Sequence, residues 1–275
     1  MSDFFQITAS GLSLGANYAL IALGFVVIYR ASQVFNFAHG EFVGIGAYLM
    51  TTFVAVGLPW PLALVASMVG TGAVAALVER AVVRPMIGRP VFVTIILTIF
   101  VGYLLRTAII VAWGIDLRNM PVPWDVLDGI KFGEVAILYN ELAAIAVGLI
   151  ALGGFFVVLK YTRLGVAMRA ASGDQEVALA LGIPVGRVFR ATWFIAGMLA
   201  ALAGIFLVMF PKYLDPNIGF VALAAFPAAV VGGLASTSTR TRPASTTGSS
   251  CVTCVAQPAP KTANAAAITG RQARR

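Results

Sequence analysis

Long runs of apolar residues are the feature that most constrains this chain. A helix needs about 20 mostly apolar residues to cross the hydrocarbon core of a bilayer. Seven runs approach or reach this length, at residues 7–29, 37–56, 61–82, 91–113, 141–159, 190–210 and 220–234. The seventh is the weakest, at about 15 residues before the sequence changes character. The runs are too long for strands, and they lack the alternation of apolar and polar residues that a membrane β-strand shows.

Composition agrees with a membrane protein. Hydrophobic residues make up 60% of the 275 residues and charged residues only 11%, whereas a soluble domain has roughly 25% charged residues. So little charge cannot cover a surface that faces water, and so apolar a chain is not disordered along most of its length. We therefore predict an all-α, polytopic transmembrane helix bundle of about six to seven spans in residues 1–234.

The positions of Lys and Arg orient this bundle. Segments 80–90 and 160–190 hold eight of them, whereas segment 114–135 holds four acids against Arg118 and Lys131. Cytoplasmic loops are enriched in Lys and Arg, so the first two segments are predicted to be cytoplasmic and the N-terminus to lie outside. Residues 1–234 hold 13 Lys and Arg against 11 Asp and Glu. This small excess does not indicate a nucleic-acid partner.

Several kinds of catalytic or cofactor site have no sequence signature here. The chain has no Gly-Lys dipeptide and so no phosphate-binding loop of the G-x-x-x-x-G-K-[ST] type. His39 is the single histidine, and both cysteines, Cys251 and Cys254, follow residue 234. These residues cannot build a zinc site in the bundle. We therefore expect no enzyme activity, no metal and no cofactor bound by this chain.

The stretch Asn36-Phe37-Ala38-His39-Gly40-Glu41 begins the second apolar run. In one interpretation it is an interfacial turn, in which Asn36 caps the helix, Gly40 allows close packing, and His39 and Glu41 lie at the level of the lipid headgroups. Ionisable groups in or near the membrane are costly and often functional. In the second interpretation, Asn36, His39 and Glu41 therefore line a substrate path or gate.

Arg106 is the one basic residue well inside a predicted span. It lies seven residues before Trp113, which is roughly 10 Å along a helix. We expect its side chain to reach the outer interface. The alternative is an ion pair with an acid such as Glu141.

Segment 160–190 is too polar to span a membrane and is predicted to form two short helices around Ser172-Gly173-Asp174. Ser172 with Gln175 fits a capping box, and Asp174 is the alternative cap. Gly182 is a natural helix stop. Val177, Ala178 and Leu181 would share an apolar face, which either lies on lipid or docks into a cytoplasmic partner.

Small residues recur at the spacing of helix contacts, in the sets Gly11 and Gly15, Gly40 and Gly44, and Gly197, Ala201 and Gly204. Such residues let helix backbones approach closely in lipid. We expect packing within one bundle, and dimerisation is the alternative.

Several stretches together resemble one known family. They are residues 15–24 (Gly-Ala-Asn-Tyr-Ala-Leu-Ile-Ala-Leu-Gly), 36–41, 79–85 (Glu-Arg-Ala-Val-Val-Arg-Pro), parts of 163–183, and 216–220 (Pro-Asn-Ile-Gly-Phe). Their order and spacing resemble the H-type permease subunit of the branched-chain amino-acid ABC importers, over most of residues 5–234.

The resemblance implies a multi-pass protein of the bacterial inner membrane and an ATP-driven machine. A second permease subunit would share the path, an external substrate-binding protein would deliver a hydrophobic amino acid, and two cytoplasmic ATPase subunits would hold ATP and Mg. Urea or short amides are alternative substrates. A stand-alone secondary transporter is a further alternative, but it would need coupling-ion carboxylates near mid-span, where the sequence shows no acid.

The resemblance also implies that segment 160–190 contacts the ATPase. The positions expected to carry this contact are Arg163, Gly165, Arg169, Ala170, Asp174, Leu181 and Gly182.

Residues 235–275 differ from everything before them. They hold 13 Ser and Thr, six Lys and Arg, and no acid or aromatic residue, so they are predicted to be a disordered basic tail that could touch anionic lipid. The abrupt loss of periodicity after residue 234 motivates the hypothesis that this tail is translated out of frame. The hypothesis fails if neither other frame of the coding DNA gives an apolar, glycine-rich continuation.

Overall fold

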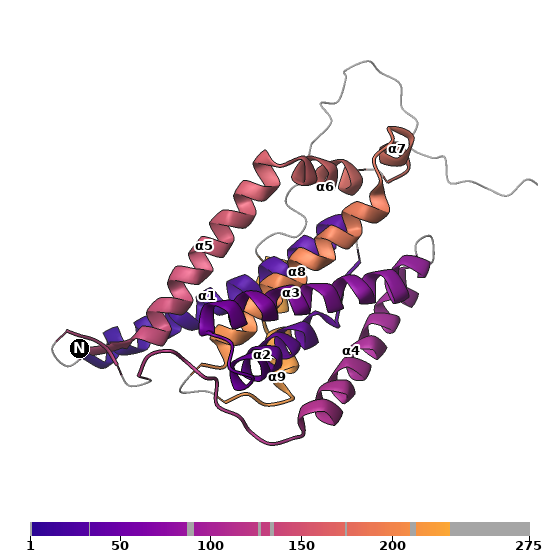
Figure 1. The fold of residues 1–275 in the computed structure, drawn as a ribbon. Coiled ribbons are helices and arrows are strands. Elements are labelled where there is room, and N and C mark those ends of the chain that lie inside the picture. The colour runs from indigo at the N-terminus through magenta and orange to yellow at the C-terminus, as the bar shows by residue number, and fades with distance from the viewer. Residues whose placement is uncertain are drawn as a thin grey trace, which may run out of the picture. The chain divides into compact units, whose positions relative to one another are not determined.

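A computed structural model describes residues 2–32, 34–86, 91–125, 128–132, 135–173, 175–209 and 213–231. Most of these residues are helical, which confirms the predicted all-α bundle (Figure 1). The longest helices are α1 (Ser2–Ser32), α2 (His39–Ala55), α3 (Trp60–Val78), α4 (Val91–Trp113), α5 (Tyr139–Tyr161) and α8 (Val185–Leu207). The short helices are η1 (Glu79–Val83), η2 (Arg84–Met86), α6 (Arg163–Gly173), α7 (Gln175–Ala180), α9 (Ile218–Leu223) and α10 (Ala225–Val231). Residues 232–275, with the predicted tail, lie outside the described residues.

Five helices of the described part are long and apolar enough to cross a membrane: Gln6–Ser32, Trp60–Met86, Phe92–Trp113, Tyr139–Tyr161 and Val185–Leu207. The runs predicted at 37–56 and 220–234 behave differently. The first forms the 17-residue α2, and the described part of the second lies in the short apolar stretch Ile218–Val231. The number of spans and the side of the N-terminus stay predictions.

Helix α2 lies inside the bundle. Eleven of its 17 residues are buried, including every residue from His39 to Tyr48. Helices α3, α8 and α9 pack against it. Because its buried residues lie on every side of the helix, protein covers most of the surface of α2.

Helix α8 packs against α1, α2 and α3, and small residues make these contacts possible. A Cβ added at Gly197 would lie 2.9 Å from the carbonyl oxygen of Thr71 on α3. One added at Gly46 would collide with Ala201. Gly40 and Gly44 likewise contact α9. Packing within the bundle is therefore confirmed for two of the three predicted sets, the one with Gly40 and Gly44 and the one with Gly197, Ala201 and Gly204. The third set, Gly11 and Gly15, faces open space.

Tryptophan side chains mark one end of the bundle. The indole N–H of Trp60 donates to the carbonyl of Pro121 at 3.1 Å, and that of Trp113 donates to the hydroxyl of Thr52 at 2.7 Å. Tryptophan is enriched at membrane–water interfaces. The loop at this end also holds a small hairpin that the sequence did not indicate, with β1 (Gly129–Phe132) antiparallel to β2 (Val135–Leu138).

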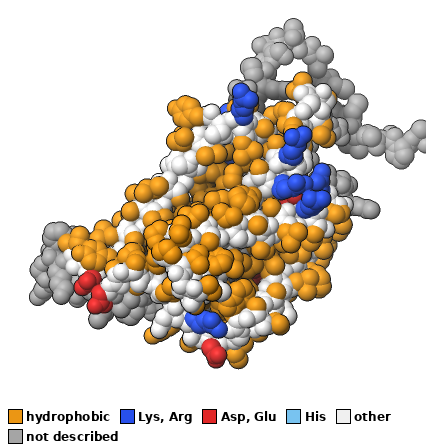
Figure 2. Space-filling model, in the orientation of Figure 1, with side chains coloured by type: hydrophobic (Ala, Val, Ile, Leu, Met, Phe, Trp, Pro, Cys, Tyr) orange, Lys and Arg blue, Asp and Glu red, His pale blue; other side chains and the backbone are white. Residues whose placement is uncertain are grey.

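Basic side chains gather near the opposite end, where α6 and η1 both pack against α8. Figure 2 shows Lys and Arg side chains at the upper right, while hydrophobic side chains cover most of the remaining described surface on that face. Helices α4 and α5 are the outermost long helices, since only 28% and 17% of their most apolar windows are buried. Such faces suit contact with lipid or with another apolar helix.

Candidate functional site

The turn before α2 is held by side-chain hydrogen bonds. The Asn36 side-chain oxygen accepts a bond from the Ala38 N–H at 3.1 Å, and the Phe37 N–H donates to the Thr98 hydroxyl on α4 at 3.3 Å. Asn36 is buried, with 2% of its surface exposed. It therefore holds the turn that precedes α2, but the prediction that it caps the helix is wrong, because Ala38 is the N-cap residue and α2 has no side-chain cap bond.

His39 and Glu41 are both buried inside the bundle, and their depth relative to the lipid headgroups stays a prediction. His39 is fully buried, and its ring centroid lies 4.5 Å from that of Phe25 on α1. A Cβ at Gly24 would collide with the imidazole, so this glycine makes room for the ring. His39 is thus enclosed between α1 and α2.

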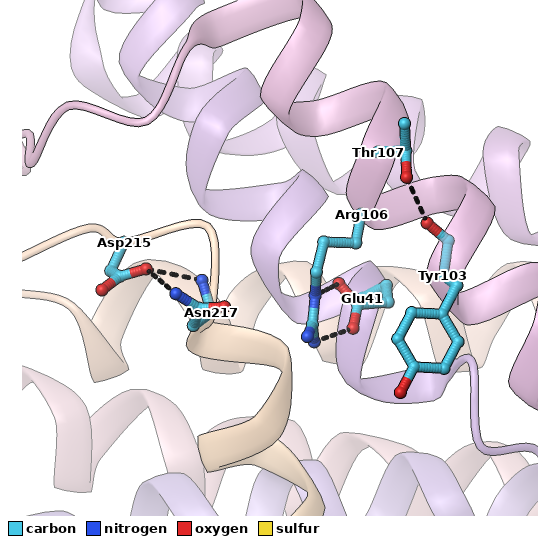
Figure 3. Close-up of polar contacts among 6 residues, drawn as sticks. All are labelled: Glu41, Tyr103, Arg106, Thr107, Asp215 and Asn217. Atoms are coloured by element: carbon cyan, nitrogen blue, oxygen red, sulfur yellow. Dashed lines mark hydrogen bonds and ion pairs between the residues drawn. The ribbon is translucent and has the colours of Figure 1, made fainter.

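Glu41 pairs with Arg106 on α4 (Figure 3). The Arg106 Nη2 donates to the Glu41 Oε1, and its Nε donates to the Oε2 at 3.4 Å. Only 11% of the Arg106 side chain and 7% of the Glu41 side chain are exposed. A two-bond arrangement of this kind fixes orientation as well as charge.

Helix α9 closes over this ion pair. The guanidinium carbon of Arg106 lies 3.6 Å from the ring centroid of Phe220, a cation–π contact. Gly40 and Gly219 bring the backbones of α2 and α9 together, since a Cβ on Gly40 would collide with the Gly219 carbonyl. The three helices α2, α4 and α9 therefore meet at one buried charge pair.

A short turn before α9 sets the direction in which this helix approaches the Glu41–Arg106 pair. The Asp215 carboxylate accepts a bond from the Asn217 backbone N–H at 2.6 Å (Figure 3). The carbonyl of Asp215 accepts the N–H of Ile218 at 3.0 Å, which starts the helix. The stretch 216–220, which is among those that carry the family resemblance, thus places Gly219 and Phe220 against the ion pair.

The first prediction for Arg106 was wrong, whereas the alternative, an ion pair with an acid, is confirmed with Glu41 in place of Glu141. Its side chain does not reach the outer interface, because it turns inward to Glu41. Glu141 instead accepts a hydrogen bond from the Ser10 hydroxyl on α1 at 2.6 Å. Charged side chains within spanning segments commonly pair with one another or with backbone carbonyls, so the sequence indicates a partner for Arg106 but does not specify Glu41.

Segment 160–190 forms two short helices, α6 and α7, as predicted. Gly165 is buried in the turn between α5 and α6, where a Cβ would lie 2.6 Å from the carbonyl oxygen of Val158. The Thr162 hydroxyl accepts the Gly165 N–H at 3.1 Å. Only a residue without a side chain fits here, so Gly165 sets the angle at which α6 leaves α5.

The remaining predicted residues of this segment lie mostly at its surface. Arg163 and Arg169 are exposed and Ala170 is half-buried. Leu181 is exposed, and Gly182 has a φ of 78°. Asp174 lies outside the described residues.

Two predicted details of this segment were wrong. The Ser172 hydroxyl donates to the Arg169 carbonyl at 2.9 Å, inside α6, and α6 continues to Gly173, so Ser172 is no cap for the following helix. The predicted apolar face is also divided. Ala178 is buried against α8, whereas Val177 and Leu181 are 53% and 74% exposed. The exposed apolar side chains are available to lipid or to a partner.

Within the described ranges, no group of three or more His, Cys, Asp and Glu side chains could hold a metal ion. Glu41 and Arg106 instead form a pair that joins α2 to α4, and Asn36 holds the turn before α2.

Comparison with known proteins identifies the family. Residues 7–262 match the family described as branched-chain amino acid transport system / permease component. The chain is 32% identical over 248 residues to the high-affinity branched-chain amino acid transport system permease protein BraD of Pseudomonas aeruginosa, which covers 85% of this chain and 80% of the relative. It is 31% identical over 250 residues to LivH of Escherichia coli, with the same coverage. No solved structure matches the chain.

The match confirms the resemblance drawn from the sequence motifs, and it extends beyond residue 234 into the predicted tail. The family consists of transport permeases and not of enzymes. Together with five helices long and apolar enough to cross a bilayer, it makes this a multi-pass protein of the bacterial inner membrane. The chain belongs to the family of permease components of branched-chain amino acid transport systems.

Proposed function

We propose that this chain is the permease subunit of an ATP-driven importer of branched-chain and other hydrophobic amino acids. The observation that carries the proposal is the match to this permease family over residues 7–262. The partners are a second permease subunit, two cytoplasmic ATPase subunits that hold ATP and Mg, and an external substrate-binding protein. This chain binds no cofactor in the proposal.

The substrate path runs along the interface with the second permease, and the buried charge pair is part of its gate. Asn36, His39 and Glu41 belong to the turn and first residues of α2, which is packed against α9 by two glycines. Movement of α4 relative to α2 must break the bond between Glu41 and Arg106, and movement of α9 must separate the Phe220 ring from the Arg106 guanidinium. The pair therefore favours a few discrete positions of these helices over a continuous range of positions. A gate requires such discrete open and closed positions.

Segment 160–190 transmits movement of the ATPase to the bundle. Its support is geometric, because α6 and α7 lie at the basic end and pack against α8, which in turn contacts α1, α2 and α3. Gly165 fixes the direction of α6, and Gly182 ends α7. Arg163, Arg169, Ala170, Leu181 and Asp174 complete the set proposed to meet the ATPase.

The proposal is tested by uptake of radiolabelled leucine in cells that lack the gene and in the same cells after it is restored. We expect leucine uptake to be restored, to be reduced by competing isoleucine or valine, and to stop when ATP is depleted. Competition by urea or acetamide instead would identify the alternative substrate class. Uptake that continues without ATP while a membrane potential is maintained would identify a secondary transporter.

A further inference from the structure

A second group of charges lies away from Glu41 and Arg106, at the end of α3. Glu79 is 1% exposed, and neither of its carboxylate oxygens accepts a hydrogen bond among the described residues. The Arg190 Nε on α8 lies 4.0 Å from the Glu79 Oε2, and Arg80 and Arg84 also interact electrostatically with this carboxylate. We call Arg80, Arg84 and Arg190 the arginine cluster.

The arginine cluster carries more positive charge than the protein neutralises. Three guanidinium groups surround one carboxylate, which leaves a net charge of +2 at this position. Arg80 and Arg84 are exposed, and 39% of the Arg190 side chain is exposed. The cluster can therefore reach a negative group outside the protein while Glu79 holds its base in place.

The beginning of α8 adds to this excess. Gly186 lies in its first turn, and a Cβ there would meet the Arg84 guanidinium at 2.9 Å. The first turn holds no acid, and Pro184 provides no side-chain cap. A helix N-terminus carries partial positive charge, so a guanidinium packed against it is unfavourable unless an anion joins them.

The surface beside the cluster is apolar. Leu77 precedes Arg80 by three residues, on the same side of the α3–η1 helix, and is 64% exposed. Phe92, in the first turn of α4, is 70% exposed, and α4 contacts η1. A ligand that satisfies both the charge and this surface has a negative head and an apolar tail.

We propose that the arginine cluster binds the phosphate of an anionic phospholipid, with the acyl chains lying over Leu77 and Phe92. Basic pockets between spanning helices bind lipid headgroups in this manner. The lipid would join the end of α3 to the start of α8, and so fix the junction beside the segment proposed to meet the ATPase. This site does not depend on which substrate is transported.

The apolar flank favours a lipid over the two other sources of negative charge. An acidic surface of a partner protein would leave Leu77 and Phe92 in contact with polar groups. Free phosphate would bind the guanidinium groups, but the apolar side chains would contribute nothing to its affinity. The experiment separates these three ligands.

The test uses the full chain, purified in detergent with the subunits that accompany it. Thermal unfolding is followed after addition of phosphatidylglycerol, phosphatidylcholine or sodium phosphate, and bound lipid is counted by native mass spectrometry. We expect phosphatidylglycerol to raise the unfolding temperature more than either other addition. We also expect it to remain bound in the mass spectrum.

The variant Arg80→Gln/Arg84→Gln is expected to bind phosphatidylglycerol about thirty-fold more weakly, because each of the two lost basic side chains contributes a factor of about five. The matched control is Arg118→Gln, which removes an exposed charge near the tryptophan-marked end and should bind as the parent does. Equal shifts with phosphatidylcholine, or an equal loss in the control, overturn the proposal. A shift with sodium phosphate as large as that with phosphatidylglycerol overturns it in favour of a free-phosphate site.

Discussion

Replacement of Arg106 by methionine is expected to lower the free energy of unfolding by about 3–5 kcal/mol, because it leaves the Glu41 carboxylate buried without a counter-charge. Glu41 is 5% exposed, and its carboxylate lies against Gly219, which leaves little room for water. The measurement is reversible unfolding of the purified protein in detergent. The control Arg118→Met removes an exposed arginine bonded to the Trp113 carbonyl and should cost about 1 kcal/mol or less.

The double variant Arg106→Met/Glu41→Met separates the two roles of the pair. Apolar residues of similar volume often replace a buried ion pair without loss of stability, so we expect most of the stability to return. Leucine uptake should nevertheless stay low, because the paired charge that defines the gate positions is gone. Full uptake by the double variant would show that the pair only holds the fold, and parental stability of Arg106→Met would contradict the buried pair itself.

Replacement of Gly182 by proline is expected to uncouple ATP hydrolysis from uptake. Gly182 has a φ of 78°, whereas proline requires about −65°. Its N–H donates to the Leu179 carbonyl at 2.9 Å, and proline removes that bond as well. The end of α7 must therefore change course. A strain of about 1–3 kcal/mol at such a position corresponds to a fall in uptake of about 5-fold to 150-fold, with ATPase activity and membrane insertion retained.

The matched control is Gly182→Asn, since asparagine tolerates a positive φ better than most residues. No heavy atom lies within 4 Å of a Cβ at this position, so the added side chain meets no obstacle. We expect near-parental uptake from this variant. Normal uptake by Gly182→Pro, or an equal loss in Gly182→Asn, would remove Gly182 from the coupling segment.

Hydropathy predicted the long helices well, because a lipid-facing helix must be apolar over its whole length. It could not predict that α2 lies inside the bundle. An apolar run such as 37–56 reads the same whether lipid or other helices surround it, and the packing of α3, α8 and α9 around α2 decides which. The hairpin at 129–138 was missed because four-residue strands leave too short a pattern to detect.

The contacts of the candidate site could not be predicted from the sequence. The sequence drew attention to Glu41 and Arg106 separately, as charges near or within spans. Their pairing joins residues 65 positions apart and depends on the turn at Asn36 and on the course of α4. Neither is encoded by local spacing. The capping by Ser172 failed for a related reason, because a serine inside a helix can bond to a preceding carbonyl instead of capping the next helix.

The most direct test of the central claim is purification of the tagged chain from native membranes in mild detergent, followed by mass spectrometry of the intact complex. The account predicts one assembly that contains this chain, a second permease subunit and two ATPase subunits. It also predicts that the ATPase subunits release ADP when ATP and Mg are added. A lone monomer or homodimer that transports leucine without any ATPase would contradict the account.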